Sequence, residues 1–274
     1  MSGFGAVPLT TSTGAVVEGI DLREATDDDI AALRQALLDH LVLFVPQQAL
    51  EPHEQLLLAR RLGEIDVAPF GPKHADVPEM TVLDQQSPAG EGADAWHSDN
   101  TFLAEPPSIT MLQSVLLPSV GGDTCWSNMY LAYEALSEPM QRLLDDLTAT
   151  HDLAKMLDVA IARGNSDADP AAMRVEYPAQ HHPVVRTHPE TGRRALFVNG
   201  NFTTRIDGLT DDESRRLLDM LFEHIQRPDF GCRFRWTPGT LTMWDNRCLQ
   251  HYAVPDYTSR RIMHRLTIAG GRPR

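Results

Sequence analysis

Two short segments, about 150 residues apart, place the strongest constraint on how this chain can fold. They are residues 95–102 (AWHSDNTF) and residues 244–252 (WDNRCLQHY). In an extended segment the side chains of residues i and i+2 point to the same side, so His97 and Asp99 can aim an imidazole and a carboxylate at one point. His251 of the second segment would complete a face of two histidines and one carboxylate. The rest of the chain is then a scaffold that must bring these segments together.

Such a ligand set indicates a particular metal chemistry. Two histidines and one carboxylate on one face hold Fe(II) and leave positions open for a co-substrate and dioxygen. A lone His-x-Asp pair is a weak signal, because most such pairs are surface or capping residues. Trp96 and Phe102 strengthen it, because they bracket the pair and would keep bulk water out.

Two arginines add a second constraint. Arg261 lies ten residues after His251, and its planar guanidinium can grip one end of a dicarboxylate by a bidentate contact. Thr124 could add a hydroxyl donor to the same carboxylate. Arg265 points to the same face of a strand as Arg261, which invites two anionic ligands, because an unpaired buried charge is expensive. The alternative for residues 260–261 is a solvated basic pair at a strand end.

Composition limits the class of protein and its partners. A length of 274 residues suits one large domain or one core with a big insertion. A net charge of −14, with no run of Lys or Arg, argues against nucleic-acid binding. We expect no membrane span and no signal peptide. The cysteines at 125, 232 and 248 form neither a zinc pattern nor a disulfide framework, so we expect a cytoplasmic location.

The pattern of apolar residues predicts an α+β chain. Strands are expected at 7–22 (two short ones), 41–45, 80–83, 109–117, 184–198 (a hairpin), 232–236, 241–244 and 262–268. Helices are expected at 26–40, 52–62, 210–226 and 129–147, the last broken near Pro139. Short strands dominate the middle and the C-terminal part, so we expect a two-sheet jelly-roll core with flanking helices.

Residues 151–182 differ from the segments around them. They have weak periodicity and many small and charged residues, and they lie between the proposed ligands. Long irregular connections in compact domains are usually functional or mobile. We therefore expect an inserted lid within a single domain of residues 1–274; the alternative is a disordered surface loop.

The motifs taken together resemble the taurine dioxygenase (TauD/TfdA) family of non-haem Fe(II) and 2-oxoglutarate-dependent oxygenases. The resemblance covers nearly the whole chain, in order. It is carried by residues 96–102 (WHSDNTF), 121–124 (GGDT), 182–189 (HPVVRTHP), 202–206 (FTTRI), 244–247 (WDNR), 250–253 (QHYA) and 260–265 (RRIMHR).

This resemblance implies a double-stranded β-helix, and it implies a role for each of the main residues of the site. His97, Asp99 and His251 would be the iron ligands. Thr124 and Arg261 would bind the C5 carboxylate of 2-oxoglutarate, whose C1 carboxylate and keto oxygen would chelate the metal.

The resemblance also implies a substrate pocket. Arg265 matches the arginine that binds the sulfonate in taurine dioxygenase, and Phe202 matches an aromatic wall. The positions that supply polar groups to taurine in that enzyme match Ala68, Gly71 and Ala93 here. None of these three side chains can donate a hydrogen bond. Lys73 and His74 lie close enough in the sequence to substitute in part, and we expect a larger or more apolar substrate with an anionic end.

We therefore expect an Fe(II)- and 2-oxoglutarate-dependent dioxygenase. It would hydroxylate a small anionic organic substrate such as a sulfonate, release succinate and CO2, and form a homo-oligomer. Within the class, the alternative is an alkylsulfate or other non-taurine oxygenase. Outside it, the alternatives are a zinc-dependent hydrolase with the same ligands and a non-catalytic jelly-roll binding protein. Arg261 and Thr124 argue against a hydrolase, which has no need of a dicarboxylate clamp, and the intact ligand set argues against a silent binding protein.

Overall fold

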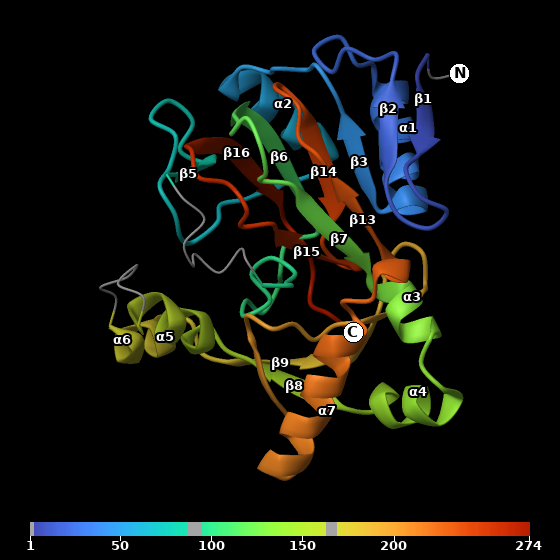
Figure 1. Cartoon of the computed structure of the whole chain (residues 1–274), viewed down its shortest axis with the longest axis vertical. Coiled ribbons are helices and arrows are strands. Elements are labelled where there is room, and N and C mark those ends of the chain that lie inside the picture. The colour runs from blue at the N-terminus through green and yellow to red at the C-terminus, as the bar shows by residue number, and fades with distance from the viewer. Residues whose placement is uncertain (1–2, 87–94, 163–168) are drawn as a thin grey trace.

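The computed structural model describes residues 3–86, 95–162 and 169–274, and its elements form a mixed α+β arrangement with several sheets (Figure 1). The largest sheet has eight strands, in the order β1-β2-β3-β14-β6-β16-β4, with β5 paired to β16. Their bounds are β1 Gly5–Pro8, β2 Ala15–Glu18, β3 Val42–Val45, β4 Ile65–Asp66, β5 Thr81–Gln85, β6 Ile109–Leu116, β14 Leu241–Asp245 and β16 Arg261–Ile268. A three-stranded sheet, β13-β7-β15, contains β7 Thr124–Asn128, β13 Gly231–Phe234 and β15 Leu249–Ala253.

Alternation along the central strands gives the large sheet two buried faces. Leu43 and Val45 of β3 belong to a cluster that also contains the apolar residues of two helices, α1 Asp27–His40 and α2 Pro52–Leu62. On the opposite face, Phe44 stacks on Phe234 of β13, with ring centroids 4.0 Å apart. Trp126 of β7 meets Phe44 edge-on at 5.2 Å. The large sheet is therefore covered by helices on one face and by the three-stranded sheet on the other.

The predicted helices are confirmed, and their ends follow from local chemistry. Thr26 and Thr210 form capping boxes in which the threonine accepts from the third backbone N–H of the helix and the acidic side chain there accepts in return. The second of these helices is α7 Asp211–His224. The predicted break near Pro139 separates α3 Met129–Glu134 from α4 Glu138–Asp145. A short 3-10 helix, η1 Pro228–Phe230, precedes β13.

Residues 151–182 are more ordered than we expected from the sequence. They contain α5 Ala154–Ala162 and α6 Pro170–Glu176, between β8 Thr148–His151 and β9 Gln180–Pro183. These two strands pair with each other, and β12 Thr203–Ile206 pairs with β8. The expectation of an irregular connection is therefore wrong for the described part of this segment. In Figure 1, α5 and α6 lie at the end of the molecule away from α1 and α2.

The remaining predicted hairpin is confirmed as β10 Val185–Thr187 paired with β11 Arg194–Leu196. Cys125, Cys232 and Cys248 are free thiols. None of the helices in the described residues combines the length and the apolar character that crossing a bilayer requires.

Candidate metal centre

The structure brings the two segments of the sequence motif into direct contact. His97 and His251 face each other in an antiparallel bridge, in which each backbone N–H donates to the other's carbonyl oxygen, at 3.1 Å and 2.8 Å. The Nε2 atoms of His97 and His251 lie 3.8 Å and 3.9 Å from Oδ1 of Asp99. All three side chains are buried. Strand pairing therefore places the three candidate ligand atoms around one point, at the cavity described below.

Neighbouring groups hold these ligands in the orientation that a metal needs. Nδ1 of His97 donates to the carbonyl oxygen of Ala95 at 2.7 Å, so the lone pair remains on Nε2, which faces Asp99. The Thr110 hydroxyl donates to Oδ2 of Asp99 at 2.7 Å, which leaves Oδ1 toward the histidines. The Asn246 side chain accepts from the Asp99 N–H at 2.7 Å and donates to the Asp99 carbonyl at 3.1 Å. The spacing of residues in the sequence predicts no role for Thr110 or Asn246.

The protonation states also suit a divalent cation. Burial and the charge of His97 lower the pKa of His251 to about 3, so its imidazole is neutral near pH 7. Burial raises the pKa of Asp99, but His251, Arg265 and His97 together outweigh that effect and hold it below the ordinary value. The carboxylate of Asp99 and the neutral imidazole of His251 lie on one side of a cavity. This arrangement fits Fe(II) and leaves room for further ligands.

A cavity of about 210 Å³ opens beside these ligands. Arg261 lines it and is only 4% exposed. Among the described residues its guanidinium forms no ion pair, and its buried Nε has no hydrogen-bond partner. Burial lowers the pKa of Arg261, although an arginine remains a cation. An uncompensated buried cation beside a metal site is an arrangement that an anionic ligand would stabilise.

Thr124 lines the same cavity, and its hydroxyl is held by a tryptophan that the sequence analysis missed. Nε1 of Trp236 donates to Oγ1 of Thr124 at 3.0 Å. The hydroxyl hydrogen of Thr124 is therefore left for another acceptor. The Trp236 ring also lies near the Arg261 guanidinium, 5.8 Å from ring centroid to Cζ. Trp236 thus contacts both residues expected to bind the distant carboxylate of 2-oxoglutarate.

Arg265 and Phe202 also line the cavity. Nη1 of Arg265 lies 3.5 Å from Oδ1 of Asp99, and its side chain is 20% exposed. Phe202 packs on Phe102, with ring centroids 5.2 Å apart. The sequence analysis missed several other lining residues, and they are Phe70, Leu83, Asn100, Leu112, Met156 and Asn201. Met156 comes from α5, whose weak apolar periodicity gave no signal of a cavity wall.

The structure does not bring Lys73 and His74 into this cavity. Nζ of Lys73 donates to the Ala68 carbonyl at 2.6 Å and to the Thr81 hydroxyl at 3.1 Å. The His74 ring instead packs edge-on against a histidine of β16. Ala68 is buried outside the lining, and Ala93 lies outside the described residues. Gly71 does line the cavity; its φ is +92°, and a Cβ there would meet Cγ2 of Thr81 at 2.9 Å.

A second buried group of possible metal ligands has its atoms already occupied. His188, Asp245 and Cys248 are close enough to share an ion. However, Nε2 of His188 donates to Asp245 at 3.0 Å, and Arg247 donates to both carboxylate oxygens, at 2.8 Å and 2.7 Å. Burial raises the pKa of Cys248 well above its ordinary value, so its thiol is protonated. This group is a salt-bridge network without a free carboxylate oxygen.

Comparisons with known proteins agree over nearly the whole chain. Residues 6–267 match the family described as "Taurine catabolism dioxygenase TauD, TfdA family". The chain is 37% identical to an alpha-ketoglutarate-dependent sulfate ester dioxygenase from Pseudomonas putida, over 97% of this chain and 89% of that protein. It is 35% identical to an alkylsulfatase from Acinetobacter baylyi, over 96% and 84%. A crystal structure of a taurine dioxygenase from Burkholderia xenovorans superposes with a TM-score of 0.85 and 32% identity, covering 99% of this chain and 93% of that one.

Proposed function

The chain belongs to the TauD/TfdA family and is an Fe(II)- and 2-oxoglutarate-dependent dioxygenase, and from that premise we propose which residues carry the reaction. His97, Asp99 and His251 hold the iron. Arg261, with the Thr124 hydroxyl, binds the carboxylate of 2-oxoglutarate that lies away from the metal. The observation that carries this assignment is the buried, unpaired Arg261 in the same cavity as the three ligands.

The substrate we propose is an alkyl sulfate or a related sulfonate. Arg265 binds its anionic end, and the alkyl chain lies along Phe70, Met156 and Phe202. The absence of a side chain at Gly71 and the commitment of Lys73 to Ala68 and Thr81 support an apolar pocket rather than one suited to taurine. The relatives from Pseudomonas putida and Acinetobacter baylyi, named for sulfate ester and alkylsulfate chemistry, support the same class.

In the reaction, the protein residues orient the reactants and exclude water. Bound iron and 2-oxoglutarate supply dioxygen activation, which yields succinate, CO2 and a hydroxylated substrate. Arg265 places the carbon next to the sulfate oxygen toward the metal, while Phe202 limits solvent access. A hydroxyl group on that carbon makes the C–O bond to sulfate labile, so the product separates into an aldehyde and hydrogen sulfate.

Kinetics with sulfate esters of different length test the substrate. Each buried CH2 contributes about 0.8 kcal/mol, and hexyl sulfate has four more than ethyl sulfate, so its kcat/KM should be higher by roughly 200-fold. Succinate formation is followed with both esters, with taurine and with an aryloxy carboxylate. Arg265→Gln should lose turnover of hexyl sulfate, whereas Arg260→Gln, at an exposed residue paired with Asp84, should keep it. Equal rates for taurine and hexyl sulfate would exclude the proposed substrate class.

We also propose how the wider fold serves this site. The large sheet and β13-β7-β15 form a double-stranded β-helix within a single domain of residues 1–274. Residues 151–182 act as a lid, supported by Met156 in the cavity lining and by Met173 and Tyr177 against the cluster that contains Phe202. Protection of this segment from proteolysis when substrate binds would test the lid.

We propose a homo-oligomer in the cytoplasm, and light scattering on the purified protein tests the assembly.

A further inference from the structure

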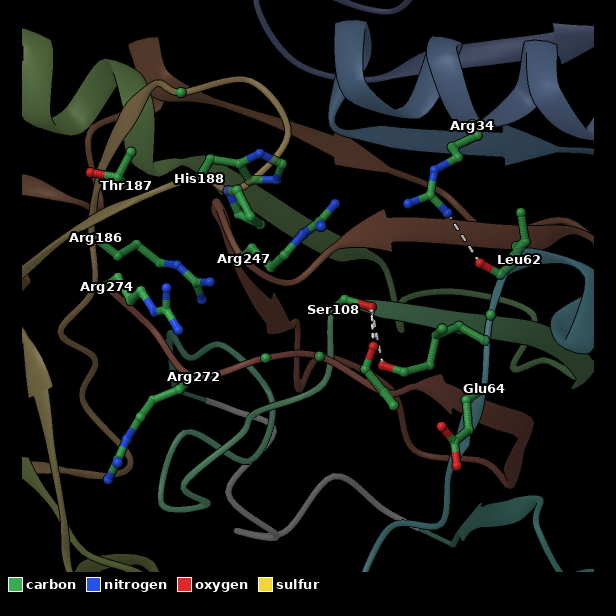
Figure 2. Close-up of a pocket in the computed structure, with 17 residues that line it drawn as sticks. Arg34, Leu62, Glu64, Ser108, Arg186, Thr187, His188, Arg247, Arg272 and Arg274 are labelled. Atoms are coloured by element: carbon green, nitrogen blue, oxygen red, sulfur yellow. Dashed lines mark hydrogen bonds between the residues drawn. The ribbon is translucent and has the colours of Figure 1, made fainter.

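A second cleft, separate from the metal centre, gathers arginine side chains. It lies between α1, the end of β10, the β14–β15 turn and residues 268–274, and its volume is about 970 Å³ (Figure 2). Five arginines line it, and they are Arg34, Arg186, Arg247, Arg272 and Arg274. None of its lining residues lines the metal cavity. In a chain of net charge −14, such a concentration of cations is unusual and needs a cause.

Two of these arginines are neutralised by carboxylates of the chain. Arg247 donates to Glu190 at 2.6 Å and to both oxygens of Asp245. Arg34 donates to the same Glu190 at 3.0 Å. Their charges are therefore compensated inside the protein.

Arg186 has no such partner. It is 4% exposed, and among the described residues its guanidinium forms no ion pair or hydrogen bond, with Nε buried and unsatisfied. Its guanidinium lies over the Phe197 ring, with Cζ 4.8 Å from the centroid. Burial lowers the pKa of Arg186 to about 10, so it still carries its charge at neutral pH. Asp245 raises the pKa of Arg186 by its charge, but its carboxylate oxygens are already occupied by Arg247 and His188.

Arg274 completes the arrangement at the mouth of the cleft. Figure 2 shows Arg186 and Arg274 extending in the same direction, whereas Arg272 points away from them. Arg274 is exposed and, in the described part of the chain, forms no side-chain ion pair. A main-chain oxygen of Arg274 accepts from the Thr187 N–H at 2.6 Å, which holds this residue beside Arg186. A buried and an exposed guanidinium thus offer several donors to one region.

We propose that this cleft is a second ligand site that binds a phosphate group, with Arg186 at its floor and Arg274 at its mouth. The planar donors of arginine match the oxygens of a phosphate, and a bound dianion would compensate the buried charge that the protein leaves unpaired. The cleft is larger than inorganic phosphate, so the group is either the free ion or one end of a nucleotide-sized molecule. Phosphate binding in this cleft is independent of the substrate proposed for the metal cavity.

Calorimetric titration tests the site directly. The protein is loaded with Fe(II) and 2-oxoglutarate under nitrogen, so that Arg261 is occupied, and inorganic phosphate is added at constant ionic strength. We expect saturable binding with a dissociation constant of about 1 mM or lower. Arg186→Met should weaken binding at least roughly tenfold, as expected for lost charge-assisted hydrogen bonds, and should be no less stable than wild type without phosphate. Arg274→Gln should weaken binding several-fold without affecting folding.

The controls separate this site from the others and identify the source of the phosphate group. Arg265→Gln and the exposed Arg216→Gln on α7 should bind phosphate as wild type does. AMP binding at least tenfold tighter than phosphate, and dependent on Arg186, would identify a nucleotide-sized ligand; equal binding would identify the free ion. No binding at 10 mM phosphate, or binding unchanged in both Arg186→Met and Arg274→Gln, would overturn the proposal.

Discussion

Among the residues that the structure describes, two buried groups each contain three side chains that could bind a metal, and they differ in what surrounds them. In the group of His97, Asp99 and His251, neighbouring residues form hydrogen bonds with the atoms that face away from the cavity. These atoms are Nδ1 of His97 and Oδ2 of Asp99. Oδ1 of Asp99 and the two Nε2 atoms are left toward a cavity. At His188, Asp245 and Cys248, Arg247 takes both carboxylate oxygens and the thiol is protonated.

Residue type therefore does not distinguish a metal centre from a salt bridge here. The distinction depends on which lone pairs of the candidate ligand atoms already accept hydrogen bonds from neighbouring residues. An arginine that donates to both oxygens of a carboxylate converts it into a structural group. A threonine that takes only the outer oxygen orients the carboxylate and leaves the inner oxygen available.

The largest expected effect comes from removing a proposed iron ligand. His97→Ala, Asp99→Ala or His251→Ala should each abolish iron-dependent turnover while the fold survives. This loss of activity exceeds the 10–100-fold that typically follows when a residue hydrogen-bonded to a metal ligand is replaced. Cys248→Ala removes one member of the other group and should keep turnover within about twofold, at a cost in stability of about 1 kcal/mol. Succinate formation after Fe(II) reconstitution measures both. Activity retained in a ligand variant would remove the contrast between the two groups.

Asp245→Asn tests the structural group. Burial raises the pKa of Asp245, but hydrogen bonds from Arg247 and His188 outweigh it and hold the pKa well below its ordinary value. Removing this charge leaves Arg247 with only Glu190, so the free energy of unfolding should fall by about 3–5 kcal/mol. A carboxyl group whose pKa is lower in the folded protein than in the unfolded chain stabilises the fold at pH values above its unfolded pKa. For Asp245 this contribution is lost progressively as the pH falls below about 4.

Denaturant unfolding at pH 7 and at pH 3 measures the effect of Asp245→Asn. The difference from wild type should shrink at the lower pH. A difference that is the same at both pH values would show that the charge of Asp245 is not the stabilising feature.

Arg261→Ala should raise the 2-oxoglutarate concentration needed for half-maximal turnover far more than the corresponding substrate concentration. Loss of a buried charged contact costs about 2–5 kcal/mol in binding. Arg261→Lys should recover little, because an ammonium group cannot reproduce the planar fork. The neighbouring Arg260→Ala is the matched control, since that side chain is exposed and pairs with Asp84. An unchanged apparent affinity for 2-oxoglutarate in Arg261→Ala would place the clamp elsewhere.

Trp236→Phe should have the smallest effect. It keeps an aromatic ring near Arg261 and removes only the hydrogen bond to Thr124, worth about 1 kcal/mol, or roughly fivefold in the apparent affinity for 2-oxoglutarate. In combination with Thr124→Val the two effects should not add, because both remove the same contact. Fully additive losses would show that Trp236 acts independently of the Thr124 hydroxyl.

The sequence predicted the parts of this molecule that depend on local patterns. The capped helices after Thr26 and Thr210, the strands and the paired hairpin follow from short-range spacing. Because side chains alternate along an extended segment, the sequence placed His97 and Asp99 on the same side of theirs. The structure brings His251 opposite them. The helices, the hairpin and the shared direction of His97 and Asp99 need no knowledge of distant partners, whereas the approach of His251 depends on strand pairing across the chain.

Features that depend on distant partners were missed or misplaced. Lys73 lies near the cavity in sequence, but its amine is committed to Ala68 and Thr81. The isolation of Arg186 depends on Arg247 having taken Asp245, which no spacing along the chain reveals. Met156 enters the cavity lining from a segment with weak periodicity, because its helix is positioned by tertiary packing rather than by its own pattern.

Fe(II) bound per chain, measured by equilibrium dialysis under nitrogen with 2-oxoglutarate present, tests most directly whether neighbouring residues decide which group binds metal. Wild type and Cys248→Ala should each bind one iron per chain, and His251→Ala should bind none at the same free iron concentration. One iron retained in His251→Ala, or lost in Cys248→Ala, would contradict the assignment of the metal centre to His97, Asp99 and His251.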